Sequence, residues 1–152
     1  MPTVFFQEPE ETKLEVAQRK VAELEGELGP EHLDLVEPLA AVMMIHYGQA
    51  QYGKAEKVCR RILAIREKSL GPEHPDVASS LNNFAGLLQG QGSYAEARPL
   101  YEQGLRSMLN HLSLNMGSIT ESERFRYLAT KTGPEPLLLN LAAMRGEGPE
   151  ED

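Results

Sequence analysis

The sequence has only one cysteine, Cys59, and no tryptophan among its 152 residues. A single cysteine cannot build an internal disulfide framework, so the small disulfide-stapled secreted folds are excluded. No segment approaches the roughly 20 consecutive apolar residues that a membrane-spanning helix needs. The start, MPTVFFQEPEET, lacks the basic residues and the long apolar stretch of a secretion signal. Together these absences predict a soluble, cytoplasmic protein.

The chain also has fewer basic residues than acidic residues. The chain carries 15 Lys and Arg against 23 Asp and Glu, which gives a formal net charge of -8. Nucleic-acid-binding proteins usually present a basic face, and the sequence shows no evident row of Lys and Arg that would make one. Acidic proteins are also repelled by anionic membranes. The composition therefore predicts a partner that is neither a nucleic acid nor a membrane.

A repeat runs through the middle of the chain. The pentapeptide Leu-Gly-Pro-Glu-His at residues 28–32 recurs at residues 70–74, an offset of 42 residues. The same offset aligns seven further pairs of identical residues, too many in one register for chance matching. These pairs are Asp34/Asp76, Leu39/Leu81, Gly48/Gly90, Gln49/Gln91, Tyr52/Tyr94, Ala55/Ala97 and Leu63/Leu105. The sequence therefore contains two copies of one structural unit, at residues 28–69 and 70–111.

Each unit has the pattern of two helices. In the second unit, apolar residues at spacings of three and four over residues 76–89 predict a first helix, with Asp76 as its N-cap. The glycine-rich stretch at 90–92 ends that helix. Ser93 and Glu96 have the spacing of a capping box, which predicts the start of a second helix at this point.

The pattern continues beyond the two units, so that the repeats span residues 11–111. Residues 11–27 match the second half of a unit, and this predicts a first helix without a pairing partner and without a polar cap. Residues 112–145 predict a divergent helical hairpin. Residues 1–10 form an N-terminal arm, and the acidic tail at 146–152 is expected to be disordered. The predicted fold class is all-α, a right-handed solenoid of antiparallel helix pairs with about seven helices.

A period of 42 residues is also compatible with HEAT-type repeats, so the residue pattern has to decide the family. In the second unit, small residues stand where helices approach closely, and large residues stand where gaps need filling. These residues are Leu81, Phe84, Ala85, Leu88, Gly92, Tyr94, Ala97, Tyr101, Gly104 and Leu105. The pattern resembles the tetratricopeptide repeat, and the longer link at 70–76 with the segments 81–85 and 94–97 resembles its kinesin-light-chain subtype. The resemblance implies a protein that binds another polypeptide and is not an enzyme.

A second resemblance covers the region after the repeats. Residues 107–110 and 122–129 are similar to the connector that follows such repeats in bacterial proteins ending in a caspase-like CHAT protease domain. No such domain follows in this sequence, so the protease activity does not carry over. The resemblance implies an alternative role, as a regulatory adaptor or sensor for a separately encoded caspase-like CHAT protease.

Reactive and metal-binding sites are not predicted. Cys59 and His46 occupy the repeat positions of Tyr101 and Leu88, which are packing positions. The four histidines lack zinc-ligand spacing, and one cysteine cannot complete a structural zinc set. The glycines at 90–92 follow a helix instead of a strand, so they do not form a phosphate-binding loop. We therefore expect no catalytic residue, no metal and no cofactor.

Asn82 and Asn83 are the first candidates for partner binding. In the kinesin-light-chain subtype, matching asparagines face a concave groove and hydrogen-bond the backbone of an extended peptide, since an amide can both donate and accept. The alternative is hydrogen bonding between helices. The first unit has Ala40 and Ala41 at these positions, so its part of the groove would lack polar side chains. Gln89, on the same predicted helix, is a third candidate.

Apolar residues supply the remaining candidates. Met43, Met44, Ile45 and Tyr47 are mostly core by spacing, but they cannot all face inward on a helix, so one or two of them are expected at the surface. Methionine adapts to varied apolar partners, and Met44 and Tyr47 are the candidates for partner binding. Phe5 and Phe6 either fold back over the first helix or insert into a partner. The sequence thus predicts an interaction module or scaffold that binds a partner polypeptide through its concave groove and its exposed terminal helix faces. Both a homo-oligomer and a subunit of a larger complex are compatible with this prediction.

Overall fold

The computed structural model describes residues 12–115, 120, 122–123 and 126. This part of the chain is helical and contains no β-strand, which confirms the all-α class. A 3₁₀ turn, Leu33–Leu35, leads into the second of five α-helices. The helices are α1 (Lys13–Leu28), α2 (Val36–Gly48), α3 (Tyr52–Leu70), α4 (Pro75–Gly90) and α5 (Tyr94–Asn115).

Several predictions fall outside the described residues. These are the N-terminal arm with Phe5 and Phe6, most of the hairpin expected at 112–145, and the acidic tail. Most of the CHAT-like stretch at 122–129 also lies there. The described residues therefore account for five of the roughly seven helices that the repeat pattern predicts.

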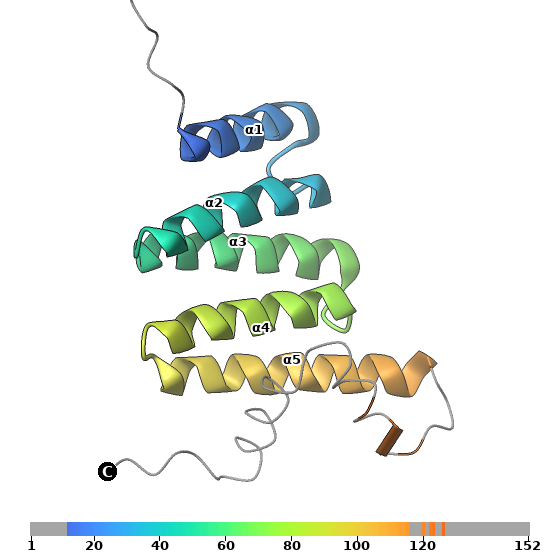
Figure 1. Ribbon diagram of the computed structural model, residues 1–152. Coiled ribbons are helices and arrows are strands. Elements are labelled where there is room, and N and C mark those ends of the chain that lie inside the picture. The colour runs from blue at the N-terminus through green and yellow to red at the C-terminus, as the bar shows by residue number, and fades with distance from the viewer. Residues whose placement is uncertain (1–11, 116–119, 121, 124–125, 127–152) are drawn as a thin grey trace, which may run out of the picture.

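The helices stack in the order of the chain. Each one contacts the next, from α1 on α2 to α4 on α5, and the connections alternate between the two ends of the stack, so neighbouring helices run antiparallel (Figure 1). Helices α2 and α3 form the first unit, and α4 and α5 form the second. Pro99 lies inside α5 without ending it, and the helix continues to Asn115.

The repeated pentapeptide forms the turn before the first helix of each unit. Gly29 and Gly71 adopt φ values of 91° and 86°, which residues with a Cβ rarely adopt. After the turn, Nδ1 of His74 accepts a hydrogen bond from the backbone N–H of Asp76 at 3.1 Å, and His32 caps the first unit in the same way. The prediction that Asp76 is the N-cap is therefore wrong. The cap is His74, and the helix begins at Pro75, whose missing N–H costs nothing at a first helical position.

Two groups of buried residues make up the core, and α3 belongs to both. The first joins α1, α2 and α3, with Val21, Leu39 and Ile62 among its members. The second joins α3, α4 and α5, with Cys59 and Phe84 among its members. Since α3 is shared, the two units and α1 pack as one continuous stack.

The terminal helix α1 is more polar on its exposed side than the repeat pattern suggested. Thr12 and Glu15 form a capping box at its start, with the Thr12 N–H donating to the Glu15 carboxylate at 2.7 Å. The exposed residues of α1 are mostly charged or polar, and only Val16 and Leu28 are large and apolar. Arg61 of α3 ties α1 in place through an ion pair with Glu25. The exposed side of α1 is therefore mostly polar, which suits contact with water.

Candidate partner-binding face

Helices α2 and α4 are the first helices of their units, and they meet near their C-terminal ends. The Tyr47 phenol oxygen lies 2.7 Å from the point that a Cβ on Gly90 would occupy. Exposed positions recur on both helices at spacings of three and four, which gives each helix one exposed face. We define the α2–α4 face by its exposed residues Glu37, Ala41, Met44, Tyr47, Asp76, Ser79 and Asn83.

Met44 and Tyr47 supply large apolar surface to this face. Their side chains are 61% and 38% exposed. The Tyr47 ring meets the Tyr52 ring edge to face, with centroids 5.5 Å apart and an interplanar angle of 65°. Tyr47 is therefore held in one orientation by Tyr52 on one side and Gly90 on another. A rigid aromatic side chain of this kind can bind a partner at a low cost in conformational entropy.

Asn82 and Asn83 point in different directions. Asn83 is exposed on the α2–α4 face. Asn82 is half-buried, and its Oδ1 lies 2.8 Å from the point that a Cβ on Gly104 of α5 would occupy. This oxygen is buried and has no hydrogen-bond partner. Asn82 Oδ1 thus lies between α4 and α5, where hydrogen bonding between helices would place it, but it accepts no hydrogen bond there.

Gln89 also turns toward α5. Its Oε1 accepts a hydrogen bond from the Tyr101 hydroxyl at 2.8 Å. Burial raises the pKa of Tyr101 above its usual value of 10.0. The bond links the two helices of the second unit and uses one of the polar atoms that Gln89 would otherwise present to a partner. Of the described candidates, Met44, Tyr47 and Asn83 are thus exposed on the first helices of the two units, and Asn82 and Gln89 lie beside α5.

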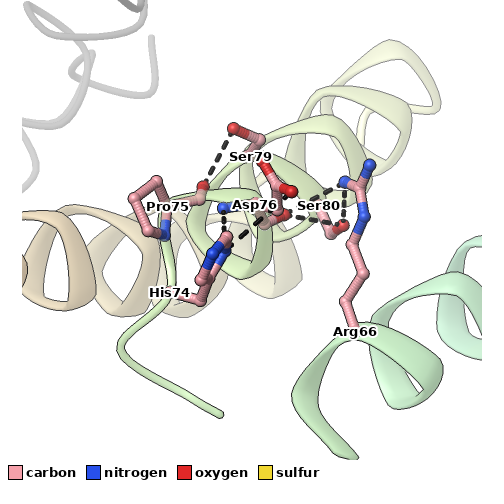
Figure 2. A network of polar contacts seen from close by, with 6 residues as sticks. All are labelled: Arg66, His74, Pro75, Asp76, Ser79 and Ser80. Atoms are coloured by element: carbon pink, nitrogen blue, oxygen red, sulfur yellow. Dashed lines mark hydrogen bonds and ion pairs between the residues drawn. The ribbon is translucent and has the colours of Figure 1, made fainter. Parts of the chain in front are cut away.

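The contact that joins the two units includes a residue that the sequence did not single out. Arg66 of α3 donates through Nη1 to the carbonyl oxygen of Asp76 at 3.0 Å and to the Ser80 hydroxyl at 2.8 Å (Figure 2). Ser80 is buried and itself donates to the same carbonyl. The repeat position of Arg66 is Met108 in the second unit, so no repeated pattern marked it.

Charge is distributed unevenly among the helices. Neither α2 nor α4 contains a Lys or an Arg. Helix α3, in contrast, carries a row of exposed bases at helical spacing, so the expectation that the chain has no such row is wrong. Part of the row is neutralised within the chain, because Arg60 pairs with Glu56 and Lys68 with Glu31. The exposed bases are Lys54, Lys57, Arg60 and Lys68.

The described residues offer little for chemistry. Cys59 and His46 are both buried, as their repeat positions predicted. Burial, with a smaller contribution from the charge of Glu56, raises the pKa of the Cys59 thiol to about 11, so it is not an activated nucleophile. Within the described part of the chain, no group of three His, Cys, Asp or Glu could hold a metal ion. Among the described helices, none combines the length and apolar composition needed to cross a membrane.

Comparison with known proteins agrees with this architecture. Residues 38–110 match the family described as Tetratricopeptide repeat. The matched segment runs from Pro38 in α2 through most of α5, and it therefore includes both helix pairs. No curated protein matches the chain. The match favours the tetratricopeptide over the HEAT alternative and supports a tetratricopeptide-repeat protein.

Proposed function

We propose that the chain is a non-enzymatic interaction module that binds a partner polypeptide on the α2–α4 face. Tetratricopeptide repeats generally mediate protein–protein interactions, and they are typically not enzymes. The observation that carries the proposal is the exposed pair Met44 and Tyr47 on α2, the first helix of the first unit, within the matched segment. Binding energy in protein interfaces is concentrated in a few residues, among which aromatic side chains such as tyrosine are enriched.

The finer features follow the kinesin-light-chain resemblance. The helix pairs form a right-handed solenoid whose concave groove contains the α2–α4 face, and an extended peptide lies along it. Asn83 supplies a side-chain amide to the peptide backbone, since its side chain is exposed and can both donate and accept. The polar outer face of α1 makes the groove a better docking surface than the terminal helix. The setting is the cytoplasm.

A display selection tests this proposal. The full chain is immobilised and offered a random library of 12-mer peptides, and the recovered peptides are sequenced. Met44→Asp is the comparison, because it places a charge at an exposed position and leaves the core intact. Peptides that bind the wild-type chain and lose binding to the variant support the proposal. Peptides that bind both proteins equally would place the binding surface elsewhere.

A matched control separates a local effect from a general one. Val16→Asp makes the same kind of change at an exposed apolar residue of α1. We expect it to leave the selected peptides bound. If Val16→Asp removes binding and Met44→Asp does not, α1 is the docking surface and the α2–α4 face is not.

A further inference from the structure

The α2–α4 face has acidic groups and no base of its own. Glu37 of α2 is exposed and forms no ion pair with another described residue. Asp76 of α4 is exposed, and its carboxylate lies 3.9 Å from His74, which carries charge only when protonated. No Lys or Arg occurs anywhere in α2 or α4 to offset these two carboxylates. The N-terminal half of the face therefore carries two acidic side chains and no basic side chain from its own helices.

The bases of α3 closest to α4 are already occupied. Arg66 donates to the Asp76 carbonyl and to Ser80 (Figure 2). Arg60 lies over the Phe84 ring at 4.9 Å and pairs with Glu56. Glu56 neutralises the charge of Arg60. The partners of Arg66 are neutral, so its charge offsets that of nearby Asp76, and Glu37 is the carboxylate of the face that remains for a basic ligand.

The other end of the face is apolar and suits a cation as well. Met44 and Tyr47 stand there, near the C-terminal ends of α2 and α4. A helix C-terminus carries partial negative charge, and the face of a tyrosine ring attracts ammonium and guanidinium groups. The C-terminal end of the α2–α4 face thus favours an apolar or a basic side chain over an acidic one.

From this charge distribution we infer that the partner segment is basic and apolar in composition. The inference rests on the proposed function, since it names the class of polypeptide that the α2–α4 face takes. An apolar side chain of the partner packs on Met44 and Tyr47, and a lysine or arginine pairs with Glu37. Glu37 and Met44 are seven positions apart on α2, or about 10 Å along its axis. An extended peptide covers about 10 Å in three residues, so the base and the apolar anchor stand about three residues apart.

Two dye-labelled probe peptides test the inference by fluorescence anisotropy with the full chain. Each is a Gly/Ser 12-mer with one Phe, and the residue three positions away is Lys in one probe and Glu in the other. We expect the Lys probe to bind about tenfold more tightly than the Glu probe at low salt, and the difference to shrink as NaCl is added. A preference for the Glu probe would overturn the inference.

Charge-reversal variants separate a local ion pair from the effect of net charge. Glu37→Lys should abolish the preference for the Lys probe. Glu27→Lys changes net charge by the same amount at an exposed position of α1, and it should keep the preference. Equal effects of the two variants would overturn the inference, because net charge alone would then explain the preference.

The remaining outcomes distinguish this inference from the proposed function. In two cases the inference of a basic segment is wrong and the proposed interaction face is still supported. In the first, library peptides need Met44 for binding but neither probe binds. In the second, the selected peptides are acidic. If the probes bind and Met44→Ser, which removes the apolar side chain without adding a charge, has no effect on them, the proposed face itself is wrong. If light scattering shows a dimer that Glu37→Lys dissociates, a second copy of the chain occupies the face and the inference of a basic segment fails.

Discussion

The Tyr47 phenol oxygen lies 2.7 Å from the point that a Cβ on residue 90 would occupy, so any side chain at this position would contact it closely. Gly90 is the repeat equivalent of Gly48, and a Cβ on Gly48 would meet nothing within 4 Å. One repeated glycine therefore makes room for an aromatic side chain of the neighbouring unit, and the other does not. The contact orients Tyr47 on the α2–α4 face and links the first helices of the two units.

The first prediction compares Gly90→Ala with Gly48→Ala. Alanine stabilises a helix by up to about 1 kcal/mol relative to glycine, so Gly48→Ala should raise the free energy of unfolding. Gly90→Ala should gain less, because the new methyl group must push the Tyr47 hydroxyl aside. Urea denaturation measures both variants. Gly90→Ala should also weaken the binding of peptides selected on the wild-type chain, and Gly48→Ala should not. Equal changes in the free energy of unfolding and in peptide binding for the two variants would show that the Tyr47 contact contributes to neither.

The second prediction concerns the close approach of α4 and α5. A Cβ on Gly104 would stand 2.8 Å from Asn82 Oδ1 and 3.2 Å from the Ala78 carbonyl oxygen. The carbonyl belongs to the backbone of a packed helix and cannot turn away, so Gly104→Ala should destabilise the protein by about 1 to 3 kcal/mol. Gly26→Ala in α1 is the control, because a Cβ there meets nothing within 4 Å, and it should stabilise the protein by about 1 kcal/mol.

Asn82→Ala completes a double-mutant cycle with Gly104→Ala. Asn82 Oδ1 is buried without a hydrogen-bond partner, so its removal should cost little. In the Asn82→Ala background, Gly104→Ala should cost less than in the wild-type chain, because one of the two close contacts is gone. Strictly additive effects would mean that the Asn82 side chain does not lie against Gly104 in solution.

The sequence predicted those parts of the fold that recur, because recurrence reveals which positions the packing requires. The 42-residue offset identified the helix pairs, and the buried positions of Cys59 and His46 followed from their repeat equivalents. For α4, the sequence pattern predicted the wrong N-cap, because Asp76 and His74 are both plausible capping residues. Only the backbone geometry shows which of the two side chains meets a free N–H.

The candidate site was harder to predict for a geometric reason. Consecutive residues on a helix differ by about 100° in direction, and in the structure Asn83 is exposed whereas Asn82 lies against Gly104 of α5. The periodic pattern fixes which face of α4 is buried, but it does not show which neighbouring helix lies beside each half-buried position. The sequence did not identify Arg66, because its equivalent in the second unit is Met108 and the offset therefore shows no identity at this position.

The third prediction tests this polar link between the units. Arg66→Met installs the residue found at the equivalent position of α5, and it removes a donor from the Asp76 carbonyl and from buried Ser80. We expect a loss of about 1 to 2 kcal/mol in the free energy of unfolding. Lys57→Met is the matched control, since Lys57 is an exposed base of α3 without an ion-pair partner among the described residues. It should change stability by less than about 0.5 kcal/mol.

Hydrogen exchange gives a second measure of the Arg66 link. Arg66→Met should speed exchange in the first turns of α4, where its acceptors lie, more than in α2. Uniform acceleration across the chain would indicate general destabilisation instead of a specific link between the units.

The last prediction concerns the buried thiol of Cys59, whose pKa rises from its usual 9.0 to about 11 mainly because of burial. The folded state then keeps a proton that the unfolded state releases. The free energy of unfolding should therefore be unaffected by this group below pH 9 and should fall as pH rises from 9.0 to about 11. Urea denaturation across this range should show a shallower fall for Cys59→Ala than for the wild-type chain. Tyr101 remains in both proteins, so its own raised pKa cancels in the comparison. The thiol should also react slowly with iodoacetamide at pH 8 in the folded protein and rapidly in urea. Equal reaction rates in the two states would show that Cys59 is not part of the closed core between α3 and α4.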